Sequence, residues 1–195
     1  MIKNVIFDIG KVLLCFDRIG LLKKYYKGND LEEFSKVLFK GWERQDEGLI
    51  SVEDYKKERI AELPENQKDA GKAILDYWEY SMFYKEGMVK LIHELKEKGY
   101  KLYVLSNMTF HFIEREYKFP IFKLFDGIVY SAPIKIIKPN PEIFKYILTK
   151  YNLNPEECVF TDDMKENLAE AARFNIKTFH YQDNTSQLRE FILSL

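Results

Sequence analysis

Short apolar segments alternate with amphipathic helical patterns along most of the chain. The apolar segments are rich in β-branched and aromatic residues, which predicts strands at residues 3–8, 101–106, 127–131, 157–162 and 176–180. Because helical patterns separate these strands, the strands must pair in parallel through crossover connections. The sequence therefore predicts an α/β fold with three layers, in which helices cover both faces of a parallel, Rossmann-like sheet.

Two of the helical patterns carry their own start and stop signals. From Met88 to Lys98 apolar residues recur on one helical face, and Gly99 follows as the expected left-handed stop. The pattern from Asn140 to Tyr151 has Pro141 in its first turn, where a missing N–H does no harm. Helices are therefore predicted over both segments.

Residues 17–85 form the longest stretch in which the periodicity is helical throughout. The pattern is broken only near Gly28, Gly48 and Pro64. The stretch is too long for a crossover and too rich in aromatic residues for a linker. We expect it to fold as a helical cap inserted after the first strand, with residues 1–16 and 86–195 forming the core domain.

Composition narrows the class of protein and its partners. With 195 residues, 46% of them hydrophobic, the chain can bury one substantial core and carry a small insertion. The 30 basic and 31 acidic residues leave no cationic footprint for nucleic acid. No segment approaches the roughly 18 continuous apolar residues of a membrane span, and both cysteines lie in apolar surroundings. We expect a cytoplasmic protein that binds a small molecule, with its oligomeric state left open.

Polar residues that could carry chemistry follow several of the predicted strands. Asp8 lies directly after the first strand, Ser106 ends the second, and Asp162 and Asp163 end a later one. Alone, Asp8 could simply cap a turn, but the carboxyl ends of parallel strands meet at one edge of a sheet. Adjacent carboxylates repel unless a cation compensates, and Mg²⁺ prefers oxygen ligands. The sequence therefore predicts a magnesium site at this edge.

Four segments, taken in order, resemble the haloacid dehalogenase superfamily of phosphohydrolases over nearly the whole chain. They are residues 4–13, 102–107, 136–141 and 158–163. The resemblance implies that Asp8 is the nucleophile, that Ser106 and the amide of Asn107 bind phosphate, that Lys138 neutralises charge and that Asp162 and Asp163 form the acidic metal motif. It also implies that Asp8, Asp163 and the backbone carbonyl of Gly10 hold Mg²⁺.

Gly10 is the one departure from the family pattern. Phosphatases of this superfamily usually carry a second aspartate there, which protonates the leaving oxygen, and a general acid is worth about 10²–10⁴ in rate. Its loss means either that another group replaces it or that the substrate has a good leaving group, such as the anomeric oxygen of a sugar 1-phosphate. Gly10 and the segments 46–51 and 160–163 also look similar to a bacterial subgroup that includes α-D-glucose-1-phosphate phosphatases, with a helical C1-type cap.

The leading hypothesis is a Mg²⁺-dependent phosphatase that acts on small phosphomonoesters through an aspartyl-phosphate on Asp8. The cap residues expected to face the site are Trp42, Glu43, Arg44, Gln45 and Asp46, and Trp42, Arg44 and Gln45 are the candidates for contact with the substrate. One alternative is a catalytically impaired relative that binds a phosphorylated ligand, for which Gly10 is the main support. A metal-independent 2-haloacid dehalogenase is the other, and the intact acid pair speaks against it.

Overall fold

A parallel sheet forms the centre of the molecule, which is described over residues 1–195 by a computed structural model. Its five strands are arranged in the order β5-β4-β1-β6-β7, and every neighbouring pair is parallel. The strands are β1 (Asn4–Phe7), β4 (Lys101–Ser106), β5 (Gly127–Tyr130), β6 (Cys158–Asp162) and β7 (Lys177–His180). Each lies within one residue of its predicted limits, and the predicted α/β fold is confirmed.

The strand register brings the ends of three strands together. Phe7 at the end of β1 pairs with Val104 of β4 and with Thr161 of β6. The N–H of Asp8 then donates to the carbonyl of Thr161 at 3.0 Å, which carries the pairing one residue beyond β1. The residues that follow these strands therefore lie at one edge of the sheet, as expected for a parallel α/β protein.

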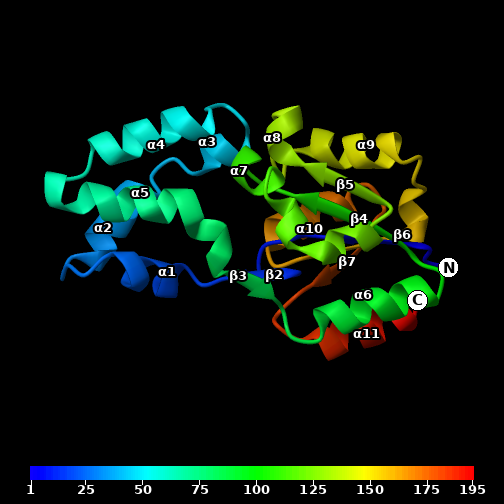
Figure 1. Ribbon diagram of the computed structural model, residues 1–195. Helices are drawn as coiled ribbons and strands as arrows, with labels where there is room; N and C mark the ends of the chain where they lie inside the picture. The colour runs from blue at the N-terminus through cyan, green and yellow to red at the C-terminus, as the bar shows by residue number, and fades with distance from the viewer.

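Helices cover both faces of the sheet. Val5 and Phe7 of β1 join the buried cluster that includes α6 (Met88–Glu97) and α11 (Thr185–Leu193). Ile6 joins the second cluster, with α9 (Pro141–Lys150) and α10 (Lys165–Ala172). Alternate residues of one strand thus point into different layers, which is why the middle of the sheet is built from largely apolar strands, whereas the edge strand β7 is not. Figure 1 shows α6 and α11 on one side of the sheet and α9 on the other.

The predicted helix boundaries on the core are confirmed in their capping geometry. α6 ends one residue before Lys98, and Gly99 has a φ of +87°, which only glycine adopts readily. At the start of α9 the side chain of Asn140 accepts a hydrogen bond from the N–H of Glu142 at 3.0 Å, with Pro141 in the first turn. The glycine stop and the proline start could both be recognised in the sequence, because they depend on local backbone conformation.

Between β1 and α6 the chain forms a group of helices beside the sheet, seen at the left of Figure 1. They are α1 (Arg18–Tyr25), α2 (Leu31–Leu38), α3 (Glu43–Asp46), α4 (Val52–Ala61) and α5 (Lys68–Tyr77). Phe34, Tyr55 and Trp78 are buried among them. The helical character agrees with expectation, and the division into a cap of 17–85 and a core of 1–16 and 86–195 remains our proposal.

An antiparallel ribbon links this helical region to the sheet, and the sequence did not indicate it. Its strands, β2 (Leu14–Phe16) and β3 (Met82–Tyr84), are three residues each. Such short strands give no measurable alternation of polar and apolar residues.

The remaining elements are short. They are α7 (Phe110–Ile113), α8 (Ser131–Ile134) and the 3₁₀ turns η1 (Glu65–Gln67), η2 (Trp78–Ser81), η3 (Glu116–Lys118), η4 (Pro120–Leu124) and η5 (Pro155–Glu157). None of the helices combines the length and the apolar character that crossing a membrane requires.

Candidate active site

Lys138 connects two carboxylates at the edge of the sheet. Its Nζ lies 2.7 Å from Asp8 Oδ1 and 2.6 Å from Asp162 Oδ2. Ser106 Oγ donates to the same Asp8 oxygen at 2.8 Å. All four side chains are buried. The structure thus brings together predicted residues from β1, β4, β6 and the loop before α9.

The position of Lys138 is set by Asn107 through its backbone. The side-chain carbonyl of Asn107 accepts from the Lys138 N–H at 2.7 Å, and its side-chain amide donates to the Lys138 carbonyl at 3.0 Å. The Asn107 side chain therefore holds the lysine loop against the end of β4. This clamp leaves the predicted phosphate contact to the main chain of Asn107.

Three carboxylates converge beside this lysine. Oxygen atoms of Asp8, Asp162 and Asp163 all lie within 4.8 Å of one another. Asp162 is fully engaged, since it accepts from Asn167 Nδ2 at 3.0 Å and from the Met164 N–H at 2.7 Å as well as from Lys138.

Asp163 is the more available member of the acid pair. Apart from Lys11 Nζ, which lies 3.2 Å away on an exposed side chain, nothing neutralises its carboxylate. Its backbone carbonyl lies 3.1 Å from His180 Nε2, a residue that sequence reasoning did not place here. The sequence did contain an indication of this position, because His180 is the last residue of a predicted strand, β7, and pairs there with Asp162.

Electrostatics at the cluster favour an additional cation. Burial raises the pKa of Asp8 to about 6, while the Lys138 ammonium opposes this shift and the Asp162 carboxylate adds to it. Burial disfavours the charge on Lys138, but the two carboxylates outweigh that effect and raise the lysine pKa. The one buried ammonium contacts two of the three converging carboxylates, and the third has only the exposed Lys11 beside it. Carboxylate oxygens of this kind fit Mg²⁺, and Asp8, Asp162 and Asp163 are the residues that could hold it.

A cleft of about 620 Å³ opens beside Gly10, between the sheet edge and the helical region. Its size is typical of small-molecule sites. Aromatic and cationic side chains from the helical region face the loops after β1 and β4 across it. The lining residues are Gly10, Lys11, Phe16, Arg18, Lys36, Phe39, Trp42, Asp46, Trp78, Met82, Asn107, Met108 and Thr109.

The predicted cap residues differ in where they lie. Trp42 lines the cleft and packs edge-on against Trp78, with ring centres 5.4 Å apart. Arg44 instead pairs with Glu58, Nη1 to Oε2 at 2.7 Å, and is not among the lining residues. Gln45 is buried. Of the three, the structure places Trp42 at the cleft.

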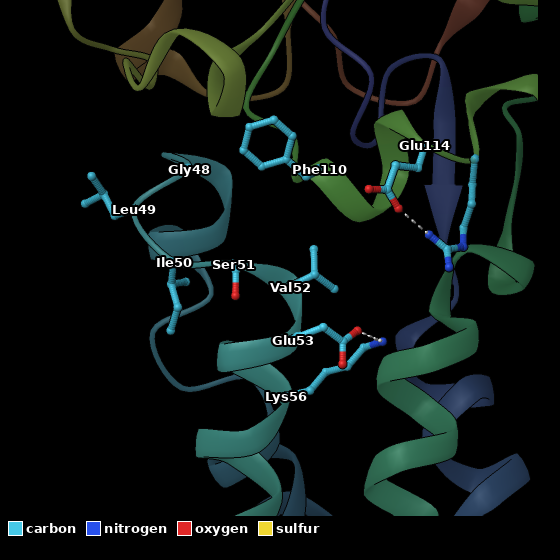
Figure 2. Close-up of a pocket in the computed structure, with 10 residues that line it drawn as sticks. Gly48, Leu49, Ile50, Ser51, Val52, Glu53, Lys56, Phe110 and Glu114 are labelled. Carbon is cyan, nitrogen blue, oxygen red and sulfur yellow. Dashed lines mark hydrogen bonds and ion pairs between the residues drawn. The ribbon is translucent and has the colours of Figure 1, made fainter.

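A second groove, of about 510 Å³, lies between the start of α4, with the loop before it, and the segment around α7. Figure 2 shows the segment from Gly48 to Val52 facing Phe110 and Glu114 across it. None of the residues predicted to act in catalysis lines this groove. It marks where the loop after α3 passes α7.

A buried hydrogen bond near the cleft was not predicted. His111 Nε2 lies 2.8 Å from Glu79 Oε2, both side chains are 1% exposed, and the imidazole stacks on Trp78. No local pattern in the sequence indicates it, because the partners lie 32 residues apart on different elements. It supports the connection between η2 and α7.

Comparison with known proteins places this geometry in a family. A model of haloacid dehalogenase-like hydrolases matches residues 2–175. Mouse acyl-CoA dehydrogenase family member 10 is 35% identical over 104 residues, which is 53% of this chain and 10% of that protein. D-ribitol-5-phosphate phosphatase of Bacteroides thetaiotaomicron is 24% identical over 214 aligned positions, covering 100% of this chain and 99% of that enzyme. This chain spans between a tenth and about half the length of the first curated relatives it matches.

Solved structures agree with the family match. A HAD family enzyme from Bacteroides thetaiotaomicron, in complex with magnesium and inorganic phosphate, superimposes with a TM-score of 0.77 at 26% identity. The alignment covers 96% of this chain and 99% of that enzyme. The family model, which spans most of the chain, and the structural likeness lead to one conclusion. This chain belongs to the haloacid dehalogenase-like hydrolases.

Proposed function

We propose that this protein is a Mg²⁺-dependent phosphatase that forms an aspartyl-phosphate on Asp8. The observation that carries the proposal is the pair of contacts from Lys138 to Asp8 and Asp162, beside the three converging carboxylates. A buried carboxylate held by an ammonium and a hydroxyl is suited to attack phosphorus in line, since both groups can also donate hydrogen bonds to phosphoryl oxygens and the ammonium neutralises their charge. The magnesium and phosphate bound to a related enzyme support the same reading.

The residues divide the work of the first step. Asp8 supplies the nucleophilic oxygen, and Ser106 and the main chain after it orient the phosphoryl group at the end of β4. Lys138, fixed through Asn107, keeps a positive charge where negative charge develops. Bound Mg²⁺ would add charge neutralisation at the phosphoryl oxygens. Asp162 holds Lys138, and Asn167 holds Asp162.

The proposed substrates are small phosphomonoesters, with a sugar 1-phosphate among them. The cleft volume of about 620 Å³ suits a metabolite rather than a macromolecule. The full-length relative named for D-ribitol 5-phosphate supports a sugar-like or polyol-like phosphate. Gly10 favours esters whose leaving oxygen needs little protonation, as anomeric, aryl and acyl phosphates do.

The test is a turnover assay across about a hundred phosphorylated metabolites, with and without Mg²⁺. We expect phosphate release that EDTA abolishes and that Asp8→Asn removes. Asp69→Asn is the matched control, since Asp69 is an exposed carboxylate in the first turn of α5. Activity that survives both EDTA and Asp8→Asn would overturn the proposal.

Two further measurements, set beside the turnover assay, separate the alternatives. A ligand-binding relative without activity would show thermal stabilisation by phosphate and Mg²⁺ but no turnover. A dehalogenase would release chloride from 2-haloacids in the presence of EDTA. The convergence of Asp163 on Asp8 argues against the latter, because carbon-centred displacement has no use for a cation site.

A further inference from the structure

Gly10 leaves an open space beside the nucleophile. A side chain starting there would meet nothing closer than Asp8 Oδ2, 3.7 Å from its Cβ, and the backbone of Gly10 has no positive φ. Steric crowding therefore does not explain the glycine. The space belongs to the cleft, and the only carboxylate among the cleft's lining residues is Asp46, at the end of α3.

Asp46 is anchored to the core even though it comes from the helical region. Its backbone carbonyl accepts a hydrogen bond from the buried hydroxyl of Ser131 in α8. Ser131 Oγ in turn accepts from the N–H of Met108 at 2.8 Å. This chain of contacts joins Asp46 to the loop that follows Ser106. The position of Asp46 is thus tied to the loop expected to hold the phosphoryl group.

Gly48 brings the same turn still closer to the core. It has a φ of +67°, and a Cβ there would lie 2.2 Å from the carbonyl oxygen of Ala132. Only glycine permits both the backbone conformation and this approach. Figure 2 shows Gly48 at the end of the turn that packs beside the core helices. The turn after Asp46 therefore rests on α8.

The surroundings of Asp46 favour its protonated form. Burial raises its pKa to about 7, a hydrogen bond from the Trp42 side chain opposes the shift, and the charges of Asp8 and Glu43 add to it. The cations that face the same cleft are Lys11 from the core and Arg18 and Lys36 from the helical region. A carboxyl that is protonated in a substantial fraction of molecules near neutral pH can both donate and accept a proton.

We propose that Asp46 is the acid–base group of this phosphatase and takes the role that Gly10 leaves vacant. The inference rests on the proposed function. In the first step Asp8 forms a bond to phosphorus, the bond to the leaving oxygen breaks, and the proton of Asp46 passes to that oxygen. The alcohol departs and Asp46 is left as a carboxylate.

The second step returns every group to its starting state. Asp46 takes a proton from a water molecule, the water oxygen bonds to phosphorus, and the bond from phosphorus to Asp8 breaks. Inorganic phosphate leaves, Asp8 is a carboxylate again and Asp46 is protonated. Other groups are committed elsewhere, because Lys138 bridges two carboxylates and His111 is buried against Glu79.

The experiment compares two substrates that differ in their leaving groups. With Asp46→Asn we expect kcat/KM for an alkyl phosphate to fall about 10²–10⁴-fold, and for p-nitrophenyl phosphate by less than about tenfold, since nitrophenolate leaves without protonation. Because the second step also lacks its base, acid quenching should trap more phosphorylated Asp8 in the variant than in wild type. Gly10→Asp in the Asp46→Asn background should restore kcat/KM for the alkyl phosphate.

One control variant and one second test variant isolate the role of Asp46. Glu47→Gln changes the neighbouring acid, which lines neither the cleft nor the second groove, and should leave both substrates unaffected. Ser131→Ala removes the hydroxyl that holds the backbone of Asp46. It should lower kcat/KM for the alkyl phosphate but not for p-nitrophenyl phosphate, and by a smaller factor than Asp46→Asn does. This second variant keeps the test informative if Asp46→Asn does not fold.

The outcomes distinguish this inference from the proposed function. Wild-type protein without turnover on any phosphomonoester would overturn both. Wild-type turnover with an equal loss on both substrates, or with no loss, would overturn only the role of Asp46. An equal loss would show that Asp46 contacts the substrate without moving its proton.

Discussion

The ammonium of Lys138 lies 2.7 Å from Asp8 Oδ1, and the Lys138 side chain is only 2% exposed. Buried charges of this kind persist only where they are paired. The lysine therefore has two effects that can be measured separately, one on the stability of the resting protein and one on the charge of the phosphoryl group during turnover.

Lys138→Met should lower kcat about 10²–10³-fold, the usual loss when one charge-stabilising group is removed. In EDTA the variant should also unfold more easily by about 3–5 kcal/mol, because two carboxylates then remain buried without their partner. Mg²⁺ should recover part of this stability. Denaturant unfolding with and without Mg²⁺ measures it, and a variant as stable as wild type in EDTA would contradict the pairing.

Asp163→Asn should weaken the binding of Mg²⁺ rather than remove the binding of phosphate. Asn167 donates its hydrogen bonds to Asp162 and not to Asp163. The carboxylate of Asp163 converges on Asp8. We expect the Mg²⁺ concentration for half-maximal activity to rise at least about tenfold, as changes at or near metal ligands usually produce. The measurement is a Mg²⁺ titration of turnover. The Asp69→Asn control should follow the wild-type curve.

The sheet and the gathering of Asp8, Ser106 and Asp162 could be predicted, because both depend on local patterns. Buried parallel strands are apolar runs, and their carboxyl ends must meet. Lys138 lies in a loop, so its place at Asp8 was expected only from family resemblance. The contact of Ser131 with Asp46 joins residues 85 apart, and that of His111 with Glu79 joins residues 32 apart. Both depend on how the helical region packs on the core, which no local pattern encodes.

Arg44→Ala should leave kcat/KM unchanged for every substrate that the wild type accepts. Arg44 is paired with Glu58 outside the cleft, and partly exposed ion pairs contribute little. Trp42→Ala, by contrast, should raise KM, because Trp42 forms part of the cleft wall. Steady-state kinetics on both variants test the contrast. A loss of kcat/KM in Arg44→Ala would place its guanidinium on the substrate.

Glu79→Gln should destabilise the protein in a pH-dependent way. Burial alone would raise the Glu79 pKa, but hydrogen bonds from His111 and Lys118 outweigh it and lower that pKa to about 2. Since this lies below the ordinary value of 4.5, the folded state favours the carboxylate. The stabilisation is fully present above pH 4.5 and is lost as the pH falls toward 2. The variant should be less stable by about 1–3 kcal/mol at pH 7, because glutamine offers the buried donors one uncharged oxygen in place of two charged ones, and the difference should shrink below pH 4.5. Urea unfolding across this range measures it. Glu114→Gln, which changes an exposed acid paired with Arg115, should show no such trend.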